Sequence, residues 1–437
     1  MMIMNKTYFV KIMTAVLCCL TLSSCCIYGK YEEKHPEAAD IQVPSYREIF
    51  QDENLLALID TALVKNIDYQ IAHERVCQAE ASLKSARLAY LPSAHLTPGI
   101  THSNQPHLNI NYNQYSFAAV SWELDIFGRM TNNKRIARAT HKMMLDYEQA
   151  ARTELIAAVA NTYYTLVMLD AQIITADSAE ANWKKSVETM RDLKAAGMTD
   201  EAAVTQFEAK YNAVIAAKKN LELQRIQTEN SMYILLGTSA YGIKRSQLDD
   251  TKVSMISELD LNVALNRPDV RAAEHNLETA FYGVKLANSN FCPRITLSGG
   301  IGLLTEELLM TAVAELVQPI FENGRLVAAK RIAKSKQREA ELGYTNVLLK
   351  AGLEINNAIA SQKSYSEQSE FYANEVDALT RALDVTRTKM RLGKGTYLEV
   401  LTSQNDLLNA QLEEIDNKMN VLKSTVGLFH AIGGGQQ

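Results

Sequence analysis

The stretch GRMTNNKRIARATHKMML at residues 128–145 has a counterpart 196 residues later, GRLVAAKRIAKSKQREAE at residues 324–341. Both begin with Gly-Arg and both contain Lys-Arg-Ile-Ala at the same place. The same offset pairs Gly197 with Gly393 and Gly237 with Gly433. Upstream, residues 68–101 match residues 269–302 at an offset of 201, with nine identical positions. Because self-similarity at a fixed spacing indicates an internal repeat, the chain is interpreted as two copies of one unit.

Each unit is predicted to fold as helix, two strands, long helix, tight turn and helix. Between Gly128 and Gly197 there is neither Gly nor Pro, which permits one uninterrupted helix of roughly 65 residues, about 100 Å long. One run of residues in it follows alternating steps of four and three, the seam of left-handed coiled-coil packing: Leu155, Val159, Thr162, Leu166, Leu169 and Ile173. The last helix keeps these steps most strictly, with one polar member: Leu401, Asn405, Leu408, Leu412, Ile415, Met419, Leu422, Val426 and Phe429.

Two strand pairs are expected, at about residues 94–103 and 109–122 and at about 294–304 and 309–319. Residues 108–122 alternate apolar and polar, as in a strand with one apolar face. Lengths near ten residues suit a membrane-crossing strand, although a packed soluble hairpin looks similar. Residues 311–317 alternate poorly, and Glu315 must face a lumen if they form a strand. Four strands cannot close a barrel, so closure in lipid requires several chains.

The first 24 residues are interpreted as a lipoprotein signal peptide. Lys6 and Lys11 precede an apolar run at residues 12–22 that is too short to span a bilayer as a helix. The run ends in Leu-Ser-Ser-Cys, which resembles the bacterial lipobox, so Cys25 is the predicted lipidation site. An ordinary signal peptide with a chance cysteine is the alternative. Two acyl chains would anchor the mature protein stably to a membrane.

The composition argues against several function classes. The chain has 45 Lys and Arg against 50 Asp and Glu, so it offers no basic footprint for nucleic acid. It has no HExxH, CxxC or GxSxG motif and no phosphate-cradling glycine loop. We therefore expect no catalytic residues, no metal site and no cofactor. The 15 methionines are interpreted as core filler rather than copper ligands, and Cys26, Cys77 and Cys292 as packed thiols.

Five motifs stand in order along residues 43–435: Tyr46-Arg47-Glu48-Ile49-Phe50, Ser121-Trp122-Glu123-Leu124-Asp125-Ile126-Phe127-Gly128-Arg129, Asn266-Arg267-Pro268-Asp269-Val270-Arg271, Pro319-Ile320-Phe321-Glu322-Asn323-Gly324-Arg325 and Ala431-Ile432-Gly433-Gly434-Gly435. Together they resemble the motifs of the TolC-type outer-membrane efflux proteins. The match is to the lipoprotein branch, often described as OprM- or NodT-like. One departure is the short second hairpin between Pro293 and Pro319, about a dozen residues below what is usual in the branch, which suggests a trimmed external loop.

The resemblance implies a mainly α fold with membrane β-strands. Duplicated helical hairpins would form a trimeric periplasmic α-barrel, and four strands per protomer would complete a twelve-stranded outer-membrane β-barrel. The chain would divide into a signal peptide (1–24), an N-terminal anchor and equatorial segment (25–65), repeat 1 (66–237), an equatorial linker (238–262) and repeat 2 (263–435).

The function implied is a passive export duct for drugs or other small molecules. The duct would be a lipid-anchored homotrimer in the outer membrane that extends into the periplasm. Its partners would be a periplasmic adaptor, an inner-membrane efflux pump and outer-membrane lipid. The exported substrate stays unidentified, because selectivity in such a system lies in the pump.

Two tight turns, at residues 195–200 and 391–396, are the first candidate site. Gly197 and Gly393 suit a left-handed helix cap, and a hydroxyl or carboxylate N-cap starts the next helix, with Thr199 and Thr396 as the candidate hydroxyls. A plain helical hairpin explains the same pattern. The resemblance implies that these turns form the periplasmic tip that docks the adaptor.

The second candidate site is a periplasmic gate, which the resemblance places on the helix after the second turn. Leu398 matches the family's apolar position and Glu399 one acidic position, but Thr402 replaces a second acid and puts a two-ring acidic gate in doubt. Thr396 and Glu399 also fit a Thr-x-x-Glu capping box, so gate and cap both stay open. Three carboxylates around a trimer axis would attract cations and raise one another's pKa.

Other functions remain alternatives to a drug duct. A structural coiled-coil lipoprotein that tethers envelope layers would explain the heptads and the lipid, but not two strand pairs placed alike in two repeats. The outer-membrane duct of a protein or metal-ion exporter would share every feature above. An envelope enzyme has the least support. Conductance in a planar bilayer separates a duct from a tether.

Overall fold

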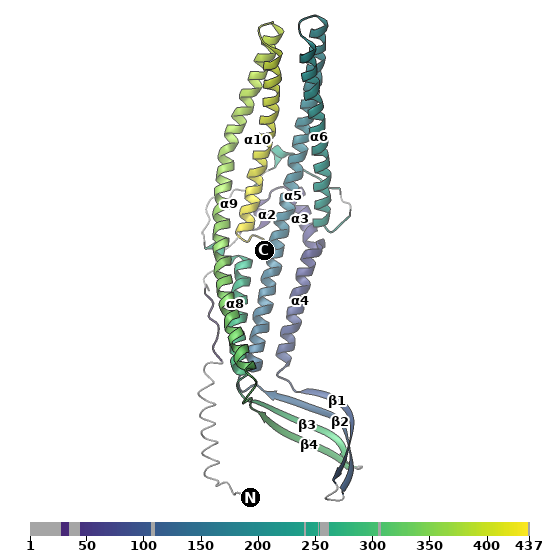
Figure 1. Cartoon of the computed structure of the whole chain (residues 1–437), viewed down its shortest axis with the longest axis vertical. Coiled ribbons are helices and arrows are strands. Elements are labelled where there is room, and N and C mark those ends of the chain that lie inside the picture. The colour runs from purple at the N-terminus through teal and green to yellow at the C-terminus, as the bar shows by residue number, and fades with distance from the viewer. Residues whose placement is uncertain are drawn as a thin grey trace. The chain divides into compact units, whose positions relative to one another are not determined.

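The computed structural model describes residues 28–34, 44–105, 110–239, 242–251, 253, 262–304 and 307–435 (Figure 1). The predicted signal peptide, Cys25 and Cys26 lie outside the described residues. The elements are α2 (Tyr46–Ile49), α3 (Glu53–Lys65), α4 (Ile67–Leu88), β1 (Ser93–Gln105), β2 (Ile110–Leu124), α5 (Arg129–Ala195), α6 (Glu201–Leu235), η2 (Leu248–Asp250), α7 (Val263–Asn266), α8 (Pro268–Ser289), β3 (Arg294–Leu304), β4 (Glu307–Val317), α9 (Arg325–Arg391) and α10 (Tyr397–Ala431).

The order of elements confirms the predicted duplication. Helices α4 and α8 have 22 residues each, α5 and α9 have 67, and α6 and α10 have 35. The strands differ, with 13 and 15 residues in repeat 1 and 11 and 11 in repeat 2. The second hairpin is eight residues shorter than the first, and the segment between β4 and α9 is three residues longer than that between β2 and α5. The sequence offset therefore falls by five, from 201 at the start of the hairpins to 196 in the long helices.

The glycines that the offset pairs end equivalent helices with the same backbone conformation. Gly197 and Gly393 have φ of +72° and +70°, and Gly237 and Gly433 have +62° and +70°. The Gly197 N–H donates to the Lys194 carbonyl (2.9 Å), and the N–H of the next residue, Met198, donates to the Leu193 carbonyl (2.9 Å). This is the Schellman pattern, which needs a left-handed residue and so favours glycine.

The chain folds into two compact units, each with parts of both repeats. Unit 1 comprises the described parts of Met1–Pro36, His73–Tyr147 and Asp269–Val347, and unit 2 those of Glu37–Ala72, Glu148–Pro268 and Leu348–Gln437. The long helices α5 and α9 contribute residues to both units.

Unit 1 contains one antiparallel sheet in the order β1-β2-β3-β4 (Figure 1). Its register aligns Trp122 with Leu297 and Ala314, and one residue along it aligns Glu123 with Thr296 and Glu315. Since side chains alternate between faces, the first row belongs to an apolar face and the second to a polar one. Glu315 therefore lies on the polar face of the sheet.

Two of the family-like motifs have structural roles in unit 1. The Asp125 carboxylate accepts hydrogen bonds from the N–H groups of Met130 and Thr131 (both 2.8 Å) and caps α5. Arg271 makes an ion pair with the buried Asp146 (3.0 Å).

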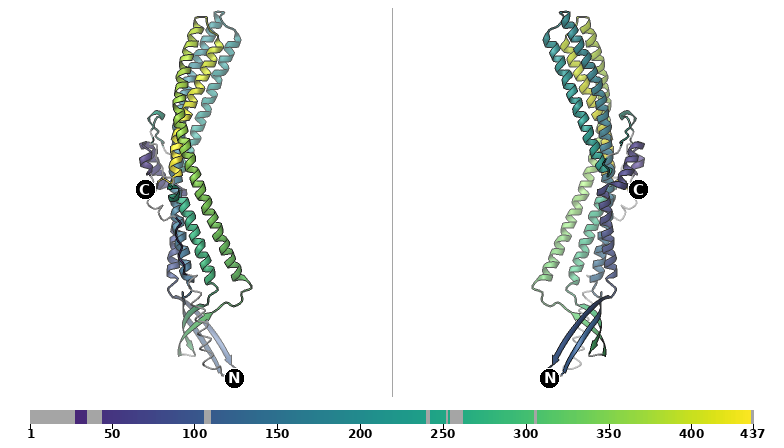
Figure 2. Two further views of the ribbon diagram at one scale, coloured as in Figure 1. Left: turned by 90° about the vertical axis from the view of Figure 1, so that its left-hand side faces the viewer. Right: turned by 90° about the vertical axis from the view of Figure 1, so that its right-hand side faces the viewer.

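Helices α8 and α9 diverge in the side views (Figure 2). A groove of about 890 Å³ lies along their small residues, among them Ala280, Gly283, Ala333 and Gly343.

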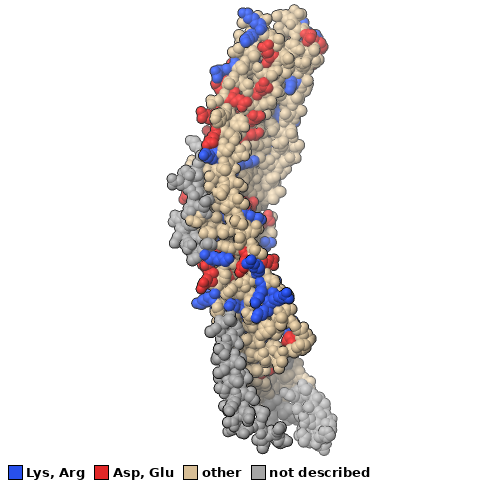
Figure 3. Space-filling view, turned by 60° about the vertical axis from the view of Figure 1, so that its left-hand side comes forward, with Lys and Arg blue, Asp and Glu red and all other residues tan. Residues whose placement is uncertain are grey.

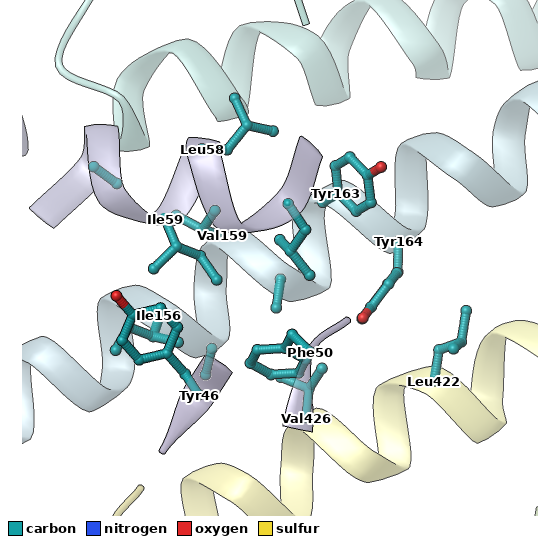
Figure 4. Packing of buried hydrophobic residues seen from close by; sticks show 14 of the residues in the cluster. Tyr46, Phe50, Leu58, Ile59, Ile156, Val159, Tyr163, Tyr164, Leu422 and Val426 are labelled. Atoms are coloured by element: carbon teal, nitrogen blue, oxygen red, sulfur yellow. The ribbon is translucent and has the colours of Figure 1, made fainter. Parts of the chain in front are cut away.

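Unit 2 has its core where α3, α5 and α10 meet (Figure 4). Tyr46 and Phe50, from the first family-like motif, are buried there, and the Asp52 carboxylate accepts a hydrogen bond from the Tyr163 hydroxyl (2.6 Å). The predicted heptad seams supply much of the rest. On α5 all predicted members except the half-buried Thr162 are buried, and on α10 the buried members are Ile415, Met419, Leu422, Val426 and Phe429.

The two repeats secure their last helices in equivalent ways. Asn66 Nδ2 donates to the Leu235 carbonyl at the end of α6 (3.0 Å). Arg267, at the corresponding position of repeat 2, donates to the Ala431 carbonyl at the end of α10 (2.8 Å) and pairs with Glu354 (2.8 Å). Both contacts satisfy carbonyls that a helix end leaves without an intrahelical partner.

Candidate functional site: the helix tips and the exposed face of α10

The two tips have the same backbone and different caps. A Cβ added at Gly197 or Gly393 would meet nothing within 4 Å, so only the positive φ restricts those positions. In the first tip the cap of α6 is Asp200, whose carboxylate accepts from the Ala203 N–H (2.9 Å). Thr199 therefore lies in the turn and is not the N-cap.

In the second tip Thr396 is the N-cap of α10. Its hydroxyl accepts from the Glu399 N–H (3.4 Å) and donates to the Glu399 carboxylate (3.1 Å). The contact between the Thr396 hydroxyl and the Glu399 N–H, which the predicted capping box requires, is thus present. It holds the Glu399 carboxylate beside the cap while leaving that side chain exposed.

The three predicted gate residues all lie on the exposed side of α10. Leu398, Glu399 and Thr402 are exposed, and Leu398 retains 54% of its accessible surface. The opposite side of α10 packs on a core around Trp183 and Phe207, to which Tyr397, Leu401 and Leu408 contribute. The α10 backbone at the candidate gate is therefore held by packing within the chain.

The exposed side of α10 continues as a polar stripe that the sequence interpretation missed. Its members follow steps of three and four, like an apolar seam, but are polar and lie on the uncovered side of the helix. The pattern was present in the sequence, yet nothing there told which face of the helix stays uncovered. We define the polar stripe as Glu399, Thr402, Asp406, Asn409, Glu413 and Asp416.

Neighbouring groups perturb the last carboxyl of the polar stripe. Asp416 accepts a hydrogen bond from Gln172 Nε2 (2.8 Å). Partial burial raises the pKa of Asp416, and the nearby Glu413 adds to this, whereas the Gln172 hydrogen bond and Lys423 oppose it. The carboxyl therefore binds a proton at a higher pH than an ordinary aspartate does.

Two kinds of feature are absent from the described residues. No group of three or more His, Cys, Asp or Glu side chains among them is arranged to hold a metal ion. None of their helices is both long and apolar enough to cross a membrane.

Duplicated long helical hairpins joined to a four-stranded antiparallel sheet define the class of outer-membrane efflux channels. The sequence profile of the outer membrane efflux protein family matches residues 58–238 and 262–434, most of the chain. The chain belongs to that family and is an outer-membrane efflux protein.

Relatives match over nearly their whole length. The probable outer membrane lipoprotein SilC of Salmonella typhimurium is 26% identical over 416 residues, which cover 92% of this chain and 90% of SilC. The toluene efflux pump outer membrane protein TtgC of Pseudomonas putida is 27% identical over 428 residues, with 91% and 87% covered. The crystal structure of a membrane protein from Pseudomonas aeruginosa superposes with a TM-score of 0.86 at 22% identity, over 93% of this chain and 97% of that one, and supports the fold.

Proposed function

We propose that this chain is the outer-membrane duct of a tripartite efflux system and works as a homotrimer with a periplasmic adaptor and an inner-membrane pump. The observation that carries the proposal is the sheet, whose outer strands β1 and β4 have no neighbour on one side among the described residues. Large apolar side chains on these strands are exposed, including Leu96, Ile100, Met310 and Leu316.

Unpaired strand edges are not tolerated in hydrocarbon, so the sheet must be completed by other copies of the chain. Three copies of four strands would make a closed barrel of twelve, an even number within the range of such barrels. The polar face with Glu123, Thr296 and Glu315 would then line the inside and the apolar face would contact lipid. A coiled-coil tether would require neither the sheet nor its two different faces.

Three regions would carry the duct's interactions. Cys25 would bear the lipid anchor, as its lipobox indicates. The tips, with Gly197, Thr199, Gly393 and Thr396, would dock the adaptor. Leu398, Glu399 and Thr402 would form the periplasmic gate, and the exposure of all three supports this placement because a gate must line the duct. The rest of the polar stripe would extend the gate's charge along the lumen.

The experiment combines mass and conductance. Purified protein in detergent should have the mass of a trimer by light scattering and should form conducting channels in a planar bilayer. A stable monomer or dimer would contradict the assembly, and trimers that never conduct would support a tether instead.

The lipid anchor has its own test. Cys25→Ser should abolish incorporation of a labelled fatty acid and release the mature protein from membranes more easily. Acylation that persists in this variant would exclude Cys25 as the site.

A further inference from the structure

Unit 1 contains a strongly basic pocket beside the sheet. A cavity of about 700 Å³ is lined by six cationic side chains and one carboxylate, that of Glu278. The cations come from three separate parts of the chain: the segment before α2, the last turn of α4 and the first turns of α5. We call these six residues the basic pocket: Lys30, Arg87, Lys134, Arg135, Arg138 and Lys142.

The charges of the basic pocket are poorly compensated. Among the described residues only Lys142 has a carboxylate within ion-pair range, that of Glu33 (3.8 Å), and both side chains are partly exposed. Lys134 lies over the Tyr90 ring (4.8 Å) and Arg135 over the Tyr282 ring (5.3 Å), contacts that orient cations without neutralising them. Glu278 is the one acid in the lining, and its Oε2 atom lies 3.4 Å from Nδ1 of His275.

Two tyrosine side chains, those of Tyr31 and Tyr282, line the pocket as well. Tyr31 is held in place because its N–H donates to the Tyr282 hydroxyl (3.2 Å). A bound group with several acceptor oxygens would satisfy the cations, and phosphate has such oxygens.

The surroundings of the pocket point to an amphipathic ligand. Large apolar side chains are exposed where the helices that line the pocket meet the strands: Leu88 at the end of α4, Leu91 before β1 and Ile126 between β2 and α5. Beyond them the strands expose Leu96, Ile100 and Trp122. A free phosphate would use only the cations, whereas a phospholipid would place its phosphate in the pocket and its acyl chains on the apolar strands.

Repeat 2 does not reproduce the full set of cations. Its long helix has cations at all four corresponding positions, Lys330, Arg331, Lys334 and Arg338. However, Asn288 stands where repeat 1 has Arg87, and Arg338 pairs with Glu341 (2.9 Å). Lys and Arg gather on the helices near the strands (Figure 3), and the basic pocket combines cations of α4 and α5 with Lys30 and is completed by Glu278 and Tyr282 of α8.

We propose that the basic pocket binds the phosphate of an anionic phospholipid from the membrane leaflet that faces the periplasm. This inference rests on the proposed function, which places the strands in the outer membrane and the helices below it. Each cation near an anionic membrane surface contributes to such binding, and arginine can grip a phosphate with two parallel hydrogen bonds. The bound lipid would fix the depth of the helix–strand junction in the membrane.

The test uses the purified full-length protein in detergent, titrated with phosphatidylglycerol or phosphatidylcholine and analysed by native mass spectrometry. The wild type should bind phosphatidylglycerol preferentially. The double variant Arg87→Gln/Arg138→Gln should bind it roughly 10- to 30-fold more weakly. Neither arginine has a carboxylate partner among the described residues. Arg87→Lys/Arg138→Lys, which keeps both charges, should lose far less of the affinity for phosphatidylglycerol.

The matched control is Arg331→Gln/Lys334→Gln, which removes two charges at the same level of repeat 2. It should leave phosphatidylglycerol binding nearly unchanged. Equal losses in the two double variants would overturn the pocket in favour of general surface attraction. Equal binding of the two lipids by the wild type would also overturn the proposal, as would complete displacement of phosphatidylglycerol by low-millimolar inorganic phosphate.

Conductance separates this proposal from the proposed function. Channels of Arg87→Gln/Arg138→Gln should conduct as the wild type does, because the pocket lies outside the candidate gate. A wild type that conducts without preferring phosphatidylglycerol would reject only the lipid site. A wild type that never conducts would reject the duct.

Discussion

Repeats 1 and 2 have helices of equal length that end at the same left-handed glycines, yet they present different surfaces. In α10 the polar stripe carries four carboxylates, those of Glu399, Asp406, Glu413 and Asp416. The equivalent positions of α6, offset by 196, carry no acid: Ala203, Gln206, Lys210, Ala213, Ala217 and Asn220. Conversely, the basic pocket takes its helical cations from α4 and α5 of repeat 1, and repeat 2 lacks a counterpart of Arg87.

Helix lengths and the left-handed glycines at the helix ends are alike in the two repeats, whereas many exposed side chains differ. Helix ends are constrained because each must satisfy its carbonyls and avoid its neighbours. An exposed face has no such partners inside the chain. The polar stripe, which is exposed on α10, and the basic pocket are therefore where we expect interactions with other molecules.

The most destabilising changes should be those at the helix ends, where both repeats are tightly constrained. In Gly237→Ala the new Cβ would lie 2.2 Å from the Lys65 carbonyl oxygen at a φ of +62°, so we expect a loss of about 3 to 4 kcal/mol in the free energy of unfolding. Gly433→Ala should lose about 2 to 3 kcal/mol, since its closest contact, Pro268 Cδ, is 2.8 Å away. Thermal unfolding followed by circular dichroism measures both.

Gly197→Ala is the matched control for strain without collision. It has the same kind of φ but no atom within 4 Å, so only about 1 kcal/mol should be lost. If Gly197→Ala were as destabilising as Gly237→Ala, the close approach to Lys65 would not be the cause.

The second prediction concerns the side chains that donate to the last carbonyls of α6 and α10, Asn66 and Arg267. Arg267→Ala should cost about 2 to 4 kcal/mol, because it removes a buried donor to the Ala431 carbonyl, and Asn66→Ala about 1 to 2 kcal/mol. Arg267→Asn copies repeat 1 and should cost about 1 kcal/mol or less. Chemical denaturation of the three variants ranks them, and an Arg267→Asn variant as unstable as Arg267→Ala would show that the two ends are not equivalent.

The third prediction concerns the tips. Gly197→Trp and Gly393→Trp should lower efflux several-fold while trimers persist, because a Cβ at either position meets no atom within 4 Å and the bulky side chain would obstruct a docked adaptor. Drug resistance of cells and trimer content of membranes are the two measurements. Ala213→Trp, on an exposed part of α6 away from the tip, controls for bulk. Unchanged resistance in both tip variants would argue against docking there.

The fourth prediction separates gate from cap at Glu399. Glu399→Gln keeps an acceptor for the Thr396 hydroxyl but removes the charge. If three such carboxylates surround the duct, the ratio of cation to anion permeability should fall roughly twofold in bilayer recordings. A ratio equal to that of the wild type would leave Glu399 as a helix cap alone.

The weakest effect should be a pH dependence that belongs to repeat 2. Since burial raises the pKa of Asp416, its charge is present above that pKa and is lost, as pH falls, sooner than for an ordinary aspartate. Cation preference should therefore decline in that pH window, and Asp416→Asn should remove this part of the decline. The same shift means that the ionised carboxyl costs stability above its pKa, a cost that disappears as pH falls through it.

Much of the secondary structure and the duplication were predictable from the amino-acid sequence. The lack of glycine and proline between Gly128 and Gly197 predicted the length of α5, and the offsets predicted its copy. The limits of β3 were matched, whereas β4 begins and ends two residues earlier than expected. Alternation fails there because the apolar Val313 and Val317 lie on the same face of the strand as Thr311 and Glu315, so the ladder with β3 decides the strand's limits.

Local backbone preferences and hydrophobic periodicity depend on the amino-acid sequence alone. They were enough to predict which segments form helices and strands, where the helices end and that the unit is duplicated. The uncovered face of α10 could not be predicted in this way, since it depends on the helices packed against the other side. The meeting of Lys30, Arg87 and the α5 cations likewise required the folded chain, because residues distant in the sequence come together only when the helices pack.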